Sequence, residues 1–334
     1  MPKQTTKHTH TVQKEYLKNF AVEENGKYLM WRLDKKTGKK IRLPIDKISV
    51  ENYFYPQEIE DWLANEIEGT GISAIKKVIE QRSVSNLTPK EKYNIAKWII
   101  VQDLRTREYR NELKQGIEET IALIYRIRFL PQKYPKVDPN ELKVMVGEKP
   151  LRNLQIAMMI RLQRYTPIIA DIYHWSICEN NTGKWYYTSD HPVIKDNAYL
   201  NSMRKVMNYK HPGSGIGYFS KGVEFHLPLT PDLKLVIRNM EPFDDMLQEI
   251  WDAIDKNPRL YSIFWKLYPH DLLKQLKSEK YNSKYENILY YNEMITGLSN
   301  RFILSIDENF QIAEQLLKRS PDYKKENRKR WKIN

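Results

Sequence analysis

The stretch Trp185-Tyr186-Tyr187-Thr188-Ser189-Asp190-His191-Pro192-Val193 is the starting point for predicting the fold. Its aromatic and β-branched beginning predicts a short strand, because such side chains pack well on a sheet. Pro192 should end the strand, since proline has no N–H to donate to a neighbouring strand. Ser189, Asp190 and His191 therefore lie at a strand end, where a rigid element often presents reactive side chains. They cannot form a catalytic triad, because neighbours on an extended chain point in alternating directions.

The residues around this stretch predict further strands. Asn180-Asn181-Thr182-Gly183 is typical of a hairpin turn, which would pair the stretch with a strand around Trp175. Apolar runs separated by turn residues predict two more hairpins, over residues 28–45 and 223–237. Helical periodicity is common elsewhere. We therefore expect an α+β fold, a predominantly helical single domain with a small antiparallel sheet of hairpins. The domain is predicted over residues 1–320, followed by a basic, frayed C-terminal tail over 321–334.

Two helical regions precede the aromatic stretch. A helix is predicted to open after Pro56 and to be interrupted at Gly69-Thr70-Gly71. Thr88-Pro89-Lys90-Glu91 is a capping box that begins a second helix, expected to continue to about Phe129. Within that helix Gln102 and Arg105 share an otherwise apolar face, so both should point inward. A buried arginine is costly unless it is satisfied, so Arg105 is either a structural ion-pair partner or a site residue.

Charge and composition limit the class of protein. The 334 residues carry a net charge of +13, and the segment from Lys318 to the end contributes +6 of it. This excess favours an anionic partner, nucleic acid first, contacted through the basic surface and the tail; the alternative is a solvated surface that serves solubility. The single cysteine, Cys178, excludes an intrachain disulfide framework. Without a signal-like or membrane-spanning run, the chain is expected to be cytoplasmic with no membrane partner.

Several short motifs occur in a characteristic order. His10 precedes Tyr16-Leu17-Lys18-Asn19-Phe20, with Thr11, Gln13 and Lys14 in between. The other motifs are Asn52-Tyr53-Phe54-Tyr55, Glu60 with Glu68, Gln102 with Arg105, Thr106 and Arg110, Ser189 to Val193, Phe225 with Pro228, Leu229 and Pro231, and Asn300-Arg301 with Ser305. Together they resemble the prokaryotic domain-of-unknown-function family 4238. Thr11, Gln13 and Lys14 depart from its pattern, since the family usually has Tyr, Pro and Gln at these positions. The resemblance implies membership of that family and supplies no reaction.

The candidate catalytic residues are His10, Gln102, Arg105 and Asp190. A histidine can act as acid or base near neutral pH, Asp190 can orient it, and Arg105 can hold a phosphate in a two-pronged contact. With the positive charge, this set suggests a nuclease-like hydrolase that acts on phosphodiesters. That hypothesis requires His10, Arg105 and Asp190 to meet in an open cleft.

Several charged residues are candidates for binding a metal ion or the substrate. Glu60, Glu68 and Asp190 are candidate ligands for a divalent metal such as Mg²⁺, and Arg110 and Arg301 are candidate substrate-binding residues. The alternative function is a non-enzymatic nucleic-acid- or protein-binding defence or stress protein, in which these residues form a structural polar network. His226, between two apolar residues of a predicted strand, is interpreted as structurally satisfied. The many aromatic side chains can stack bases but more often fill a core.

Overall fold

A computed structural model describes residues 8–48, 50–52, 55–129, 138, 142–200, 217–262, 277–326 and 328. The motif residues Tyr53 and Phe54 and most of the tail after Glu326 lie outside the described residues. The expectation of a largely helical α+β fold is confirmed, with 54% helix and 19% strand. The expectation of one small sheet of hairpins is wrong, because there are two sheets of five strands each, one of them mixed.

The first five-stranded sheet has the strand order β11-β6-β10-β9-β8. Its strands are β6 (His174–Asn180), β8 (Ile194–Asp196), β9 (Glu224–Thr230), β10 (Leu233–Arg238) and β11 (Lys280–Ser283). The predicted hairpin over 223–237 is confirmed as the antiparallel β9–β10 pair. The sheet is mixed because β11 runs parallel to β6, while the other neighbours are antiparallel.

The second five-stranded sheet has the order β2-β3-β12-β7, and β4 also pairs with β3. Its strands are β2 (Val22–Glu24), β3 (Lys27–Asp34), β4 (Lys40–Pro44), β7 (Thr188–Ser189) and β12 (Phe302–Ser305). The predicted hairpin over 28–45 is confirmed as β3–β4. A separate two-stranded sheet pairs β1 (His8–His10) with β5 (Val50–Asn52).

The hairpin predicted around the aromatic stretch is wrong. Both edges of β6 are already paired, one with β10 and the other with β11, so the returning chain finds no free edge there. The Tyr186 N–H donates instead to the Pro231 carbonyl at 2.8 Å, and the Tyr187 N–H donates to Asn292 Oδ1 at 3.0 Å. Only Thr188–Ser189 forms a strand, and it pairs with β12 in the second sheet. The aromatic stretch therefore connects the two sheets.

The predicted interruption at residues 69–71 is also wrong. Helix α2 (Gln57–Trp62) passes through a π-helical turn, η3 (Leu63–Glu68), directly into α3 (Gly69–Gln81). Gly71 serves helix packing, because a Cβ there would lie 2.6 Å from the Cβ of Trp98 on the next helix. The glycine lets the two helices approach closely.

The capping box is confirmed at the start of α4 (Pro89–Leu104), where the Glu91 N–H donates to Thr88 Oγ1 and the Thr88 N–H donates to Glu91 Oε2. The helix does not continue to Phe129 as predicted. It ends at Leu104, and α5 (Arg107–Ile124) begins after Thr106, whose hydroxyl accepts the Tyr109 N–H at 3.3 Å. The break follows from the preference of threonine for an N-cap over a helix interior.

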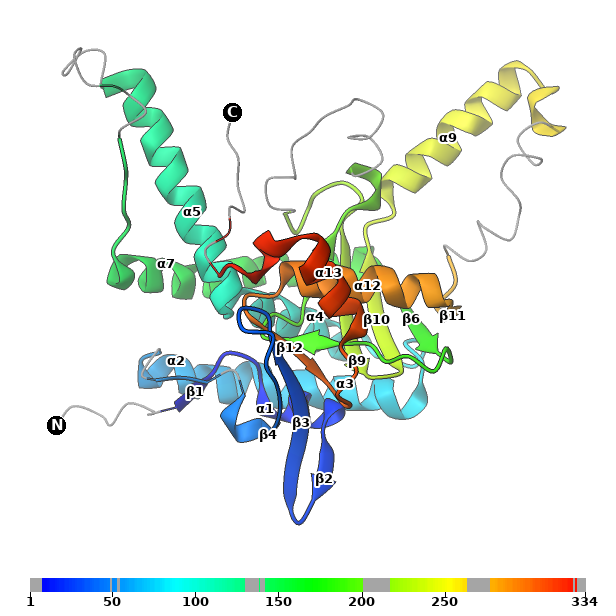
Figure 1. Ribbon diagram of the computed structural model, residues 1–334. Helices are drawn as coiled ribbons and strands as arrows, with labels where there is room; N and C mark the ends of the chain where they lie inside the picture. The colour runs from blue at the N-terminus through cyan, green and yellow to red at the C-terminus, as the bar shows by residue number, and fades with distance from the viewer. Residues whose placement is uncertain are drawn as a thin grey trace.

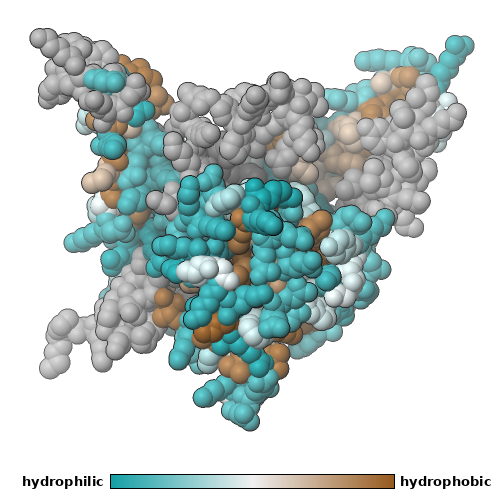
Figure 2. Space-filling view, in the orientation of Figure 1, coloured by the Kyte–Doolittle hydropathy of each residue, from teal (hydrophilic) through white to brown (hydrophobic). Residues whose placement is uncertain are grey.

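The remaining helices complete the body. They are α1 (Lys14–Leu17), η1 (Lys18–Phe20), η2 (Ile45–Lys47), η4 (Tyr125–Phe129), α7 (Glu148–Arg161), η6 (Leu162–Tyr165), η7 (Ile168–Ile172), α9 (Glu241–Lys256), α12 (Tyr285–Leu298), α13 (Gln311–Arg319) and η8 (Pro321–Lys324). Helices α5 and α9 project from the body (Figure 1), and hydrophobic residues show on both projections in Figure 2. No helix in the described part of the chain has the length and apolar character to cross a membrane.

The two faces of the first sheet differ in chemistry. Phe225, Leu227, Leu235 and Ile237 belong to the large hydrophobic core that includes Trp98 of α4. Side chains alternate along a strand, so the polar residues between these positions face the other way. That second face lies toward α12, which contacts β8 and β11.

Candidate functional site

Arg105 and Gln102 hold the N-terminal segment against α4. Arg105 is 3% exposed and Gln102 is 1% exposed, so the prediction that both point inward is confirmed. The Arg105 guanidinium donates to Glu68 Oε1 at 2.6 Å and to the backbone carbonyl of His10. The Gln102 amide donates to the Thr11 carbonyl at 2.9 Å. Both side chains therefore donate hydrogen bonds to neighbouring protein groups.

His10 joins this network through its backbone. Its imidazole is half-buried, and burial lowers the ring's pKa while a hydrogen bond with the Ile48 backbone opposes the shift. Glu60 on α2 is near enough to act electrostatically on Arg105. The structure thus brings together four of the predicted residues: His10, Gln102, Arg105 and Glu68.

Asp190 lies in a different network. Its carboxylate accepts the backbone N–H groups of Asn300, Arg301 and Phe302 at 3.0, 2.8 and 2.9 Å, which fixes the entry to β12. Burial raises the pKa of this carboxyl, and the hydrogen bonds from Phe302 and Arg301 oppose the rise. Among the described residues, no hydrogen bond or ion pair joins Asp190 to His10 or Arg105. The catalytic roles assigned to these residues stay predictions.

The two predicted substrate-binding arginines have protein neighbours. The Arg301 guanidinium donates to Asp34 Oδ2 at 2.7 Å. Arg110 is 8% exposed on α5. Neither side chain is presented freely on the surface.

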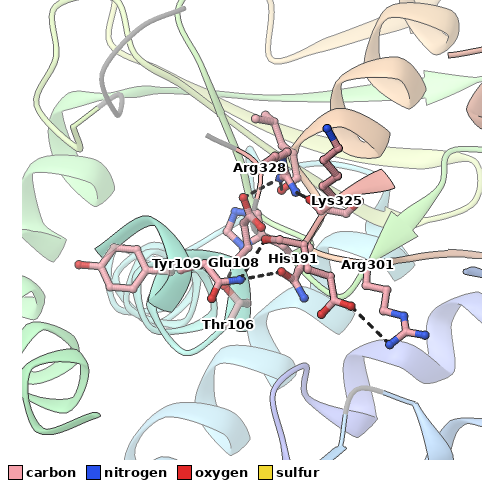
Figure 3. Close-up of polar contacts among 12 residues, drawn as sticks. Thr106, Glu108, Tyr109, His191, Arg301, Lys325 and Arg328 are labelled. Carbon is pink, nitrogen blue, oxygen red and sulfur yellow. Dashed lines mark hydrogen bonds and ion pairs between the residues drawn. The ribbon is translucent and has the colours of Figure 1, made fainter. Parts of the chain in front are cut away.

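A polar cluster at the start of α5 anchors part of the tail. Figure 3 shows Arg328 and Glu108 directed toward each other beside His191. The ion pair measures 2.6 Å, and both side chains are less than 10% exposed. The Thr106 hydroxyl lies 2.8 Å from His191 Nδ1. The expectation that the tail is frayed is therefore wrong at Arg328, while the predicted division at residue 320 stays a prediction.

The predicted metal ligands are not grouped. Within the described ranges, no three His, Cys, Asp or Glu side chains cluster in a way that could hold a metal ion. Glu68 is paired with Arg105, and Asp190 already accepts three backbone N–H groups. Metal dependence stays a prediction.

A charged cavity of about 210 Å³ lies on the polar face of the first sheet. Residues from all five strands of this sheet and from α12 line it, among them Asp196, Glu224, His226, Lys234, Arg238 and Tyr290. Ala198, Asn287 and Tyr290, which also line it, are exposed, so solvent reaches its rim. The cavity is therefore accessible to a small ligand.

Lys234 is the unusual group in this cavity. It is 5% exposed, and its Nζ lies over the rings of Tyr186 and Tyr291, at 5.2 and 4.6 Å from their centroids. In the described part of the chain, this ammonium has no hydrogen-bond or ion-pair partner. Burial lowers its pKa. An unpaired buried cation is costly, and an anionic ligand would relieve that cost.

Glu224 and His226 form a second reactive element beside Lys234. Arg238 Nε donates to Glu224 Oε2 at 3.0 Å, and His226 Nε2 lies 3.4 Å from the same oxygen. Burial raises the pKa of Glu224, but the contacts with His226 and Arg238 have the larger effect and hold this pKa at about 2. Burial lowers the pKa of His226, which favours a neutral imidazole at neutral pH.

The interpretation of His226 as structurally satisfied is wrong. Its Nδ1 atom is buried and has no hydrogen-bond partner among the described residues. The sequence does carry a signal for this site, because Glu224 and His226 alternate with apolar residues along β9, as Lys234 and Arg238 do along β10. Such alternation usually marks a solvated sheet face, and only the position of α12 shows that this face is covered.

Comparison with known proteins gives one match. The model of the family described as Protein of unknown function (DUF4238) matches residues 8–309. No curated protein and no solved structure matches the chain.

Proposed function

Because this chain belongs to the DUF4238 family, whose description names no reaction, we propose from the geometry of the charged cavity that it is a phosphodiester hydrolase. The observation that carries the proposal is the Lys234 ammonium, which is buried in a solvent-accessible cavity without an anionic partner. A phosphate oxygen is a suitable partner for such a cation, and charge-assisted hydrogen bonds are strong in a poorly solvated site.

The size of the cavity limits the substrate. A volume of about 210 Å³ accommodates one phosphodiester group with part of an attached sugar, and it is too small for a duplex. Arg238 is held by Glu224 and by the Tyr281 hydroxyl, at 3.0 and 2.7 Å, so its charge is fixed beside the cavity. Glu224 offsets the charge of Arg238, so Lys234 is the group that would attract a single phosphate.

The cavity residues suit water-dependent cleavage. Neutral His226 would take a proton from a water molecule as the water oxygen attacks phosphorus. Glu224 would stabilise the resulting imidazolium across the 3.4 Å contact. Lys234 would stabilise the charge that develops on the phosphate oxygens and supply a proton to the leaving oxygen. The products are a phosphomonoester and an alcohol.

The second candidate function is binding without cleavage. It is favoured by the way in which Gln102, Arg105 and Asp190 are engaged with backbone groups, as expected for a structural polar network. In this candidate these residues support the fold, and the cavity holds an anionic ligand without cleaving it.

Hydrolysis of bis(4-nitrophenyl) phosphate by the full chain, with and without Mg²⁺, tests the proposal. We expect turnover that falls at least about 100-fold in His226→Gln, the range typical of a lost general base. The turnover of Lys234→Met should fall to a similar extent. Lys256→Met removes an equal charge from the exposed end of α9, and its turnover should not change.

Calorimetric titration with inorganic phosphate separates the two candidates. Phosphate binding that is lost in Lys234→Met, without turnover in the intact protein, would leave the binding function alone. If the intact protein shows no turnover and binds no phosphate, both candidate functions are refuted.

A further inference from the structure

We infer that Trp185 and Tyr285 form a stacking platform for unpaired bases, and that the substrate is therefore single-stranded nucleic acid. This inference rests on the proposed function, because it uses the Lys234 cavity as the place of the neighbouring phosphate. It assigns a role to Trp185, the residue of the aromatic stretch that is exposed rather than packed in the core with Tyr186 and Tyr187.

The platform surrounds a small surface hollow of about 30 Å³. Trp185 and Tyr285 line this hollow and are 38% and 45% exposed. Both are large aromatic side chains that line the same hollow and leave part of their rings open to a ligand. Lys184 and Asp307 also line it and provide polar groups at its edge.

The hollow and the charged cavity lie on opposite sides of the aromatic stretch. Trp185 and Tyr187 line the hollow, whereas Tyr186 between them points the other way. The Tyr186 ring carries the Lys234 ammonium, and its hydroxyl contacts Ser283, which lines the cavity. The aromatic stretch therefore lies between the proposed base-stacking surface and the phosphate-binding cavity.

The backbone that carries the platform is held by α12. Asn292 donates to the Trp185 carbonyl at 2.9 Å and accepts the Tyr187 N–H at 3.0 Å, so both sides of the stretch are tied to α12. Tyr285 is the first residue of the same helix. Preorganisation of this kind lowers the entropy that binding would otherwise cost.

Single-stranded nucleic acid is the ligand class that satisfies both surfaces. Its bases have free faces that stack on exposed aromatic rings regardless of sequence, and its backbone supplies the anion that Lys234 lacks. Bases of a duplex are already stacked on each other and cannot reach a platform. The net charge of +13 further favours a polyanion over an apolar peptide.

Fluorescence anisotropy with two labelled strands of equal length and charge tests the inference. One strand is an oligothymidylate, and the other is an abasic sugar-phosphate strand. We expect the intact protein to prefer the strand with bases, and Trp185→Ala or Tyr285→Ala to weaken that binding at least about fivefold. Trp185→Phe should recover part of the loss, and Trp251→Ala, an exposed tryptophan on α9, should cause none.

The outcomes separate this inference from the proposed function. Equal binding of both strands by the intact protein, or no loss in either aromatic variant, would overturn the platform. Failure to bind either strand would overturn it as well. In each case, loss of bis(4-nitrophenyl) phosphate turnover in Lys234→Met would still support the hydrolase. If Lys234→Met leaves that turnover and the binding of the abasic strand unchanged, the proposed function is refuted, whatever the binding result for the Trp185 variants.

Discussion

Replacing Lys234 by methionine should stabilise the free protein. Lys234 is 5% exposed, and its ammonium lies over two aromatic faces, at 5.2 and 4.6 Å, while Glu224 and Asp196 act on it only from a distance. Desolvating such an ion costs several kcal/mol, and two cation–π contacts return about 2 kcal/mol between them. Methionine keeps an apolar stem of similar length. We therefore expect Lys234→Met to raise the free energy of unfolding by about 1–3 kcal/mol at neutral pH.

Urea denaturation of the free protein measures this change, with an unchanged m-value showing that the same surface is exposed on unfolding. The matched control is Lys195→Met. The Lys195 side chain is 14% exposed, but its Nζ lies 2.7 Å from Asp103 Oδ2. Its removal leaves the buried Asp103 carboxylate with the Tyr218 hydroxyl and His191 as neighbours and no lysine counter-charge, and should destabilise by about 3 kcal/mol. The two substitutions should therefore have opposite signs.

The pH dependence gives a second check. The folded protein lowers the pKa of Lys234 from 10.5, so the unfolded chain holds the proton more strongly. The cost of the ammonium is then fully present below the folded pKa and disappears as the pH rises to about 10.5. The advantage of Lys234→Met should shrink over the same range. A destabilisation by Lys234→Met at neutral pH would refute the reasoning, because it would show that the ammonium is satisfied in the fold.

Three further predictions concern the fold and the cavity. Gly71→Ala should destabilise by about 1–3 kcal/mol in urea denaturation, because its Cβ would meet Trp98, whereas Gly69→Ala in the same helix has room and should stabilise by up to about 1 kcal/mol; equal effects would contradict the packing argument. Asp190→Ala should lower the free energy of unfolding by about 3 kcal/mol, because three backbone donors lose their acceptor, and an unchanged stability would argue against a structural role. Glu224, with a pKa of about 2 in the fold, stabilises the protein above pH 4.5, and this contribution of about 3 kcal/mol should be lost as the pH falls through 2; Glu224→Gln should remove that pH dependence, and a variant that keeps it would show that another group is responsible.

Local interactions made some features predictable. The capping box at Thr88 was correct because its hydrogen bonds join residues three positions apart. The inward direction of Gln102 and Arg105 followed from helical spacing alone. Helix boundaries were less secure, since the cap at Thr106 competes with a continuous apolar pattern.

Long-range pairing decided the rest. The partner of the aromatic stretch was wrong because β11, about a hundred residues later, occupies the free edge of β6. Likewise, Asp190 meets residues 300–302 rather than Arg105, and no local pattern connects those positions.

The sequence by itself determined the α+β character, the basic charge, the family motifs and the amphipathic faces, because these depend on composition and on contacts between near neighbours. Only the tertiary structure decided that the polar face of β9 and β10 is covered by α12 and encloses an unpaired ammonium. The physical reason is that side-chain alternation tells which residues share a face, whereas the free energy of a charge on that face depends on what packs against it.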